Sequence, residues 1–259
     1  MTQEFLDSKQ YTELSILRYE AVYGHNYISP GGKNIADEFI NTLNLREGLS
    51  VLDIGCGLGG PAFRMASKSG VHVHGIDLSA NMIRIAKTRL KEEKLNNLIS
   101  FTHANCLELQ AFEEYHVIHS RDVLLHISDK NRLFEVIRRI LVSGGQLGFS
   151  DYCLGVTKPS PEFKVYLQER NYSLLNVEDY TTLLKKAGFT NIIGKDKTLL
   201  FIKILKNELN NLETAPLNKK DKSSMRKSWK EKLKRAQSRE QGWAWFTASR
   251  DYITGKHHD

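Results

Sequence analysis

The chain has 259 residues, of which 41% are hydrophobic and 26% charged, so it can bury the core of one large domain. Three widely spaced cysteines argue against a disulfide framework and favour a reducing, cytoplasmic location. The N-terminus does not look like a secretory leader, and no apolar run is long enough to predict a membrane span. The net charge of +7 is concentrated in residues 219–239, where ten Lys and Arg face two acids.

The first ~45 residues are expected to be helical, because Ile35, Phe39 and Leu43 recur at helical spacing behind a Pro-Gly-Gly breaker. From residue 50 onward, strands and helices alternate. Ser79 is expected to cap a helix over 79–94, and Asp129 a helix that ends at Gly144-Gly145. Strands are predicted at 50–54, 71–77, 98–104, 115–120 and 146–152. This repetition predicts an α/β, Rossmann-like, doubly wound and mostly parallel sheet.

Residues 153–176 break this rhythm and are expected to form a small helical cap insertion over the sheet. Beyond it we expect a helix at 177–189, a long helical tail over about 198–240, and a last strand at 242–250. The predicted organisation is one domain, with N-terminal helices over 1–48 acting as a lid, a ligand-binding core over 49–152, the cap, and C-terminal helices and strand over 177–259.

The turn after the first predicted strand reads VLDIGCGLGG, and Gly55, Gly57 and Gly60 fit the G-x-G-x-x-G pattern. This pattern alone fits dinucleotide enzymes equally well. Asp53 precedes the first glycine, and a carboxylate there suits an amino-bearing ligand but would repel a pyrophosphate. Asp77 ends the second strand, where it can accept from ribose hydroxyls. Asp53 favours S-adenosylmethionine over NAD, whereas Asp77 suits both, since NAD enzymes bind ribose in the same way.

VLDIGCGLGG together with HGIDLS resembles the first two motifs of the class I S-adenosylmethionine-dependent methyltransferases, over about residues 50–150. The resemblance implies a seven-stranded sheet and a place for S-adenosylmethionine. At the end of the third strand, where many relatives carry Asp, this chain has Asn105, whose side chain or backbone would meet the adenine. The residues implied at the cofactor are Asp53, Gly55, Gly57, Asp77, Leu78, Asn105, Cys106, Ser120 and Arg121.

The stretch SRDVLLHI follows the fourth predicted strand, and in a helical turn Asp122 and His126 would face the same way. An ammonium group has a pKa near ~10.4, so methylation of an amine needs a base, and a histidine of pKa ~6.5 can serve. Asp122 can attract the ammonium. An O-methyltransferase could use the same histidine, and a purely structural histidine at the start of the next helix is the alternative.

Nearly the whole chain resembles the phosphoethanolamine N-methyltransferases, most closely the small single-domain kind of malaria parasites. The segments that carry the likeness are SKQYTE, NYISPGG, SRDVLLHI, SDYC, FKVYLQERNYSLL and SWKEKLKRAQSREQGWAWF. The resemblance implies N-methylation of phosphoethanolamine or its mono- and dimethyl forms toward phosphocholine. It also implies a catalytic pair, Tyr11 and His126. The substrate would meet Gln10, Ile28, Ser29 and Asp122 around the amine, and Tyr152, Tyr166, Arg170, Tyr172 and Lys232 around the phosphate.

The residues support this phosphate site independently. Tyr166 and Arg170 are four apart, so a helix would point both at one place, and an arginine with several phenols suits a phosphate. An aromatic patch that only packs the insertion is the alternative. Lys232 falls at the edge of an apolar stripe that includes Met225 and Trp229, from which it could reach an anion or extend to water.

Two other functions stay open at this point. Another small-molecule methyltransferase, acting on an amino acid or a sterol, would share the cofactor half but lack the phosphate site. The basic segment 219–239 could instead bind nucleic acid, although its Trp and Leu positions suggest packing against its own domain. We expect a small-molecule substrate, no nucleic acid, no metal and a monomer.

Overall fold

The computed structural model describes residues 2–252, apart from the side chains of Phe5, Lys9 and Gln10. Its strands are β1 Ser50–Ile54, β2 His72–Asp77, β3 Ile99–His103, β4 Tyr115–Arg121, β5 Leu141–Leu154, β6 Phe189–Asp196 and β7 Gln241–Arg250. Its helices are α1 Gln3–Phe5, α2 Glu13–Tyr23, α3 Gly32–Ile40, α4 Gly60–Ser69, α5 Ala80–Glu93, α6 Lys130–Ile140, α7 Pro161–Glu169, α8 Val177–Lys186, α9 Thr198–Thr214 and α10 Lys219–Gln237, with a π-helical turn η1 at Leu6–Gln10 and 3₁₀ turns η2 at Cys106–Glu108 and η3 at Leu124–His126.

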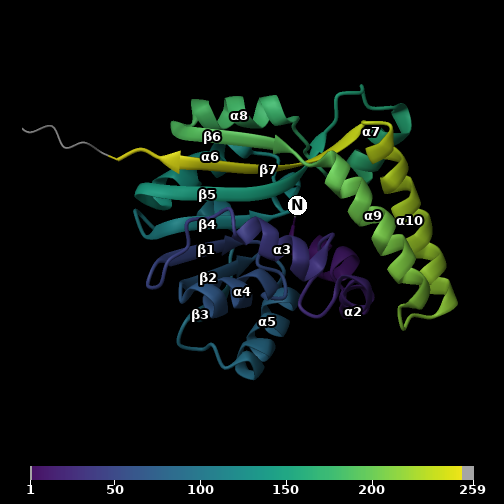
Figure 1. Cartoon of the computed structure of the whole chain (residues 1–259), viewed down its shortest axis with the longest axis horizontal. Helices are drawn as coiled ribbons and strands as arrows, with labels where there is room; N and C mark the ends of the chain where they lie inside the picture. Colours follow the sequence, from purple (N-terminus) through teal and green to yellow (C-terminus); the bar gives the residue numbers. More distant parts are fainter. Residues whose placement is uncertain (1, 253–259) are drawn as a thin grey trace, which may run out of the picture.

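The seven strands form one sheet in the order β3-β2-β1-β4-β5-β7-β6 (Figure 1). Strands β3, β2, β1, β4 and β5 are parallel, and β7 runs antiparallel to both β5 and β6. The order reverses on either side of β1, as in doubly wound sheets whose ligands bind at the carboxyl ends of the strands. The predicted α/β, mostly parallel seven-stranded fold is confirmed.

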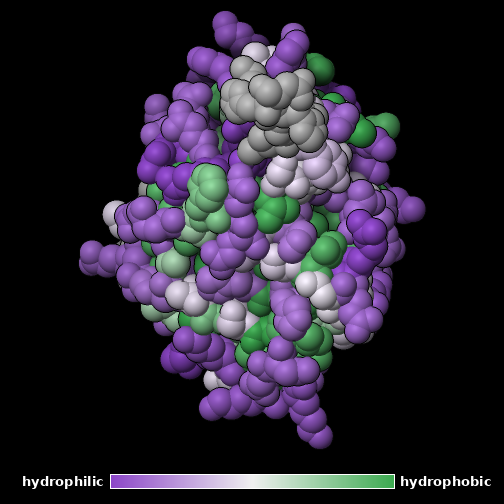
Figure 2. Space-filling model, turned by 90° about the vertical axis from the view of Figure 1, so that its left-hand side faces the viewer, coloured by the Kyte–Doolittle hydropathy of each residue, from purple (hydrophilic) through white to green (hydrophobic). Residues whose placement is uncertain are grey.

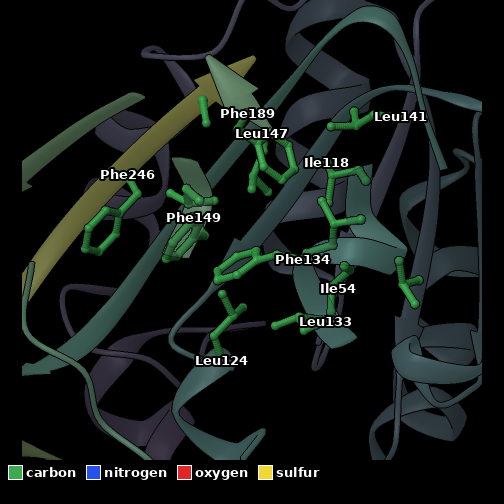
Figure 3. Close-up of a cluster of buried hydrophobic side chains, with 14 of the residues drawn as sticks. Ile54, Ile118, Leu124, Leu133, Phe134, Leu141, Leu147, Phe149, Phe189 and Phe246 are labelled. Atoms are coloured by element: carbon green, nitrogen blue, oxygen red, sulfur yellow. The ribbon is translucent and has the colours of Figure 1, made fainter. Parts of the chain in front are cut away.

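Both faces of the sheet are apolar because its strands are covered on both sides by helices. Val51, Val73 and Val117 point to the face covered by α4 and α5. On the other face Ile54 and Ile118 pack with residues of α6 and α8, and Figure 3 shows part of that cluster, including Phe134, Leu147 and Phe246. Each fully buried side chain of this size contributes about 1.5–3 kcal/mol relative to exposure.

Three features of the C-terminal half differ from the sequence prediction. The tail predicted as one helix is a hairpin of α9 and α10, because Pro216 follows the end of α9 and cannot continue it. Strand β6 lies in a stretch to which the sequence assigned no strand. Gly144-Gly145 lies inside β5, since α6 already ends at Ile140, and β5 pairs irregularly with β4 near Tyr115.

Helices α2, α9 and α10 project beyond the carboxyl ends of the parallel strands (Figure 1). Tyr23 of α2 stacks on Trp229 of α10, with ring centroids 5.3 Å apart, and Met225 lies in the same cluster. The apolar stripe of α10 therefore packs on its own domain. The opposite end of the molecule is largely hydrophilic (Figure 2). Within residues 2–252 no helix combines the length and the apolar character that crossing a bilayer requires.

Candidate active site

A cavity of about 200 Å³ lies where β1 to β4 end. Turns after these four strands form its walls, and the N-terminal segment completes it. The structure brings together there most of the residues predicted from the sequence, from both the cofactor and the acceptor sets: Tyr11, Ile28, Ser29, Asp53, Gly55, Gly57, Asp77, Leu78, Asn105, Cys106, Arg121, Asp122 and His126. The side chain of Gln10 lies outside the described part of the structure.

The glycine turn after β1 needs residues without a Cβ. Gly55 and Gly57 have φ angles of +71° and +53°. A Cβ on Gly55 would lie 2.3 Å from a methyl carbon of Val123, so this backbone passes directly against the segment after β4. The N–H of Gly57 donates to Asp77 at 2.9 Å. The turn thus ties the ends of β1, β2 and β4 together around the cavity.

Asp53 is almost fully buried, and one of its carboxylate oxygens is held by a histidine. Nδ1 of His119, which is itself fully buried, lies 2.7 Å from Asp53 Oδ1. The other oxygen, Oδ2, is buried and has no hydrogen-bond partner among the described residues. Buried polar atoms are nearly always paired. Because Asp53 lines the cavity, Oδ2 is suited to accept from an ammonium group of a ligand.

Asp77 is bound on both oxygens by backbone N–H groups. Oδ2 accepts from Gly57 at 2.9 Å, and Oδ1 accepts from Ser79 at 2.8 Å. Burial raises the pKa of Asp77 to about 6, against the lowering effect of these two bonds. Each oxygen retains a lone pair for ribose hydroxyls. The backbone carbonyl of Leu78 meets Nε2 of His103 at 3.0 Å.

The segment after β3 uses its asparagine side chain internally. Asn105 Oδ1 accepts from the N–H of Leu107 at 3.1 Å, and Nδ2 donates to Glu108 at 2.8 Å. The side chain therefore caps η2, and the Asn105 carbonyl is also engaged, because it accepts from the N–H of Glu108 at 3.0 Å. Burial raises the pKa of the Cys106 thiol to about 12, so this cavity-lining thiol stays neutral.

Ser120 and Arg121, both predicted at the cofactor, connect the site to its surroundings. Ser120 Oγ donates to the carbonyl of Ile54 at 2.8 Å, which links β4 to β1. The Arg121 guanidinium donates to the carbonyls of Pro30 and Gly32, at the start of α3. Arg121 thereby fixes the loop that brings Ile28 and Ser29 to the cavity, and it lines the cavity with its own side chain.

Asp122 does not lie on a helical turn with His126, so the predicted four-residue spacing on one helix is wrong. Its φ is +56°, and the 3₁₀ turn η3 starts only at Leu124. Asp122 Oδ1 accepts from Ser150 at 2.9 Å and from the Trp243 indole at 2.7 Å. Oδ2 is buried, with no partner among the described residues, at the cavity wall. This oxygen is available to a cationic ligand.

His126 ends η3 and faces the cavity. Its ring meets that of Tyr172 edge-on, with centroids 5.1 Å apart. Nδ1 is buried and has no hydrogen-bond partner among the described residues. Burial, assisted by the positive charges of Lys130 and Arg170, lowers the pKa of His126 to about 3. The imidazole is therefore neutral near pH 7, but with this pKa it is a weak base unless the nearby positive charges are compensated.

The residues predicted at the phosphate cluster on the other side of His126. Tyr172 also meets Tyr166, with ring centroids 6.0 Å apart, and the Arg170 guanidinium lies 5.7 Å from the Tyr166 ring centre. Lys232 Nζ donates to the Tyr152 hydroxyl at 3.3 Å. Burial lowers the pKa of Lys232 to about 8, with Arg170 acting in the same direction. Arg170 and Lys232 thus lie against phenol rings near His126, and a third cation, Arg235, lies 4.1 Å from the centre of the Tyr166 ring.

Comparison with known proteins identifies the family of this chain. A family profile described as "Methyltransferase domain" matches residues 45–236. A phosphoethanolamine N-methyltransferase of Plasmodium falciparum is 34% identical over 258 residues, which are 95% of this chain and 96% of that protein. The chain belongs to this family. Phosphoethanolamine N-methyltransferase 1 of Zea mays is 42% identical over 96% of this chain, which spans about half of the plant protein's length.

The same family includes a solved structure of closely similar shape. Phosphoethanolamine N-methyltransferase 2 of Haemonchus contortus, in complex with phosphomonomethylethanolamine and S-adenosylhomocysteine, has a TM-score of 0.93 and 33% identity. The match covers 96% of this chain and 60% of that one. The family resemblance inferred from the sequence is confirmed.

The N-terminal segment of this family member is bound to α5 by hydrogen bonds. The Asp7 carboxylate accepts from Ser79 Oγ at 2.5 Å and from the Ala80 N–H at 3.3 Å. The Asn81 side-chain amide donates to the carbonyls of Asp7 and Tyr11 at 3.3 and 3.2 Å. These bonds hold the segment beside the cavity, with Leu6 and Tyr11 in its wall.

Sequence reasoning missed three groups that shape the site: His119, Trp243 and Glu208. Glu208 Oε1 accepts from the N–H of Gly31 at 2.6 Å, and burial raises its pKa to about 7. A signal for it was present, because Glu208 continues the buried helical stripe of Phe201 and Leu205. Within residues 2–252 no group of three potential metal ligands gathers.

Proposed function

We propose that this chain transfers a methyl group from S-adenosylmethionine to the nitrogen of phosphoethanolamine, its mono- or dimethyl form, or several of these, toward phosphocholine. One observation carries the proposal. His126 lines the cavity and, through Tyr172, also touches the cluster of cations and phenols. A proton acceptor between a cofactor cavity and an anion site matches a substrate with an amine at one end and a phosphate at the other.

The cofactor half is suited to S-adenosylmethionine. Asp53 Oδ2, buried and unpaired among the described residues, would accept from the ligand's amino group, and Asp77 from its ribose. Leu78, Asn105, Cys106 and Arg121 complete these walls. Ser120 would contribute indirectly, because its hydroxyl donates to the Ile54 carbonyl and so holds the end of β1 in place. When bound, the cofactor supplies a methyl group on a positively charged sulfur.

The acceptor half would prepare the amine. Asp122 Oδ2 attracts the ammonium, and His126 takes a proton from it so that the nitrogen has a free lone pair. A phosphate paired with Arg170 cancels one of the charges that lower the pKa of His126. Substrate binding thus raises the basicity of the imidazole. Correct placement and exclusion of water would supply most of the remaining rate enhancement.

The phosphate would be held by Arg170 and Lys232 and by the hydroxyls of Tyr152, Tyr166 and Tyr172. Guanidinium and ammonium groups form short, charge-assisted hydrogen bonds to phosphate oxygens. Burial raises the pKa of the Tyr152 and Tyr172 phenols well above the usual value, assisted by Asp122 at Tyr152 and by the Tyr166 phenol at Tyr172, so both remain donors. The cap, residues 153–176, contributes three of these five residues.

The N-terminal part, residues 1–48, would act as a lid over the 49–152 core, with Tyr11, Gln10, Ile28 and Ser29 closing the site on the substrate. Residues 177–259 would support the anion site. A monomer in the cytoplasm is the state we propose, and the three free cysteines support a reducing compartment.

A radiolabelled methyl-transfer assay tests the proposal, with phosphoethanolamine, its mono- and dimethyl forms, ethanolamine and glycine as acceptors. We expect transfer to at least one phosphorylated base, inhibition by inorganic phosphate, and weak transfer to ethanolamine and glycine. Equal rates on ethanolamine and phosphoethanolamine would refute the phosphate site, and a preference for glycine would favour an amino-acid methyltransferase.

A further inference from the structure

Lys130 is a buried lysine whose ammonium is fully engaged with backbone carbonyls. The residue is the first of α6 and only 4% exposed. Its Nζ donates to the carbonyls of Leu124 at 3.0 Å, Ile127 at 2.7 Å and Ser173 at 2.7 Å. An ammonium has three N–H donors, so this arrangement satisfies all of them.

The three carbonyls belong to the two segments that meet at the proposed reaction centre. Leu124 and Ile127 flank His126, and Ser173 follows Tyr172. A further bond joins these segments, from the Ser173 N–H to the Leu125 carbonyl at 2.8 Å. Lys130 therefore links the turn that carries His126 to the segment that carries Tyr172, the proposed hydrogen-bond donor to phosphate. The ring centroids of His126 and Tyr172 are 5.1 Å apart.

The charge of Lys130 has a counter-charge farther into the core. Asp151 attracts Lys130, and it accepts from the Tyr180 hydroxyl at 2.5 Å, while the ammonium lies 5.8 Å from the centre of the Tyr180 ring. Removing an ammonium from water is costly, and a neutral donor could serve carbonyls with less desolvation. A charged residue at this place is therefore explained best by an effect on its neighbours.

We propose that Lys130 is a positioning residue of the methyl transfer, which fixes the His126 turn against the Tyr172 segment. The inference rests on the proposed function. The imidazole is faced by Lys130 from α6, by Arg170 and Tyr172 from the segment after α7, and by Tyr11 and Asp122 across the cavity. Among these, Lys130 and Arg170 oppose protonation of His126, and Arg170 loses that effect when it pairs with phosphate. Lys130 does not, because its three N–H groups stay on carbonyls.

The test compares three substitutions of Lys130 with two controls. Lys130→Met removes the charge and the donors, Lys130→Gln keeps a neutral donor, and Lys130→Arg keeps the charge with a different shape. Lys87→Met removes an exposed lysine of α5. Tyr180→Phe weakens the buried network without touching the three carbonyls. Each variant is measured for kcat, for both KM values, for its pH profile and for its melting temperature.

We expect Lys130→Met to lose about tenfold to a hundredfold in kcat, since ångström-scale misplacement of a catalytic group has effects of this size. The KM for S-adenosylmethionine should change less than about twofold, since the crosslink lies on the acceptor side. Loss of the charge raises the pKa of His126, so activity of Lys130→Met and Lys130→Gln should fall at a higher pH on acidification than that of the wild type. Lys130→Arg should keep the wild-type pH profile with a reduced kcat.

Lys87→Met should match the wild type, and Tyr180→Phe should melt earlier with unchanged kinetics. Wild-type kcat and pH profile in Lys130→Met, or in Lys130→Gln if the former does not fold, would overturn the proposal. So would the same kinetic changes in Tyr180→Phe. NMR titration of His126 separates this inference from the proposed function, because an upward pKa shift in Lys130→Gln is expected whether or not the wild type methylates phosphoethanolamine. An unchanged titration would refute the electrostatic effect.

Discussion

The two halves of the site are built in different ways. The proposed cofactor half is largely backbone and short turns that follow β1, β2 and β3, between Asp53 and Cys106. The acceptor half is assembled from side chains as distant as Tyr11, His126, Arg170 and Lys232. A substitution in the cofactor half should therefore change the binding of S-adenosylmethionine and leave that of the phosphorylated amine nearly unchanged. A substitution in the acceptor half should do the reverse.

The largest effect is expected on the acceptor side, from His126→Ala. Loss of a general base typically lowers the rate by about 10² to 10⁴. We expect a fall of this size in kcat, while the affinity for S-adenosylhomocysteine measured by calorimetry stays the same. His72→Ala, at the exposed first residue of β2, is the control. Undiminished turnover of His126→Ala would remove the base from the mechanism.

Arg170→Met should next raise the KM for phosphoethanolamine. Hydrogen bonds to charged groups are worth about 1.5–3 kcal/mol, which corresponds to roughly tenfold to a hundredfold. Inhibition by inorganic phosphate should weaken in parallel. Lys164→Met removes an exposed cation from the preceding helix, α7, and should change neither constant. A rise in the KM for S-adenosylmethionine alone would contradict the division into two halves.

Asp53→Asn probes the cofactor half. It keeps the shape of the side chain but removes the negative charge that would face the ligand's amino group. We expect the dissociation constant of S-adenosylhomocysteine to rise about tenfold, as for the loss of one charge-assisted hydrogen bond, with little change in phosphate inhibition. Asp179→Asn, exposed on α8, is the matched control. Unchanged cofactor affinity would mean that Asp53 serves only to hold His119.

The smallest effect is expected from Asp7→Asn, at the border of the two halves. Substitution of a group that binds the N–H donors at a helix start costs about 1 kcal/mol, so the KM for S-adenosylmethionine should rise roughly fivefold or less. The bound cofactor product should also protect the N-terminal segment less well from proteolysis. Glu4→Gln, exposed in α1, controls for loss of an acidic charge. If the cofactor product protected the N-terminal segment from proteolysis equally well in Asp7→Asn and Glu4→Gln, the Asp7 hydrogen bonds would not be what holds this segment.

The sequence pointed to the proposed cofactor half because its signals are local. The glycine pattern and the two acids at strand ends lie between Asp53 and Asp77, and the alternation of strand and helix repeats over residues 50–152. The acceptor residues came from the family resemblance, since nothing in the spacing of Tyr152, Arg170 and Lys232 brings them together. The helical turn expected at Asp122 was wrong because a positive φ at an aspartate has no reliable sequence signal.

The amino-acid sequence by itself determined the class of fold, the place of the glycine turn and the identity of the acids beside it, since periodicity and turn chemistry act between near neighbours. Only the tertiary structure decided which polar atoms are buried and paired. It placed His119 on Asp53, Trp243 on Asp122 and Lys130 beneath the His126 turn. These pairings join residues as much as 121 positions apart, and they depend on packing that no local pattern records.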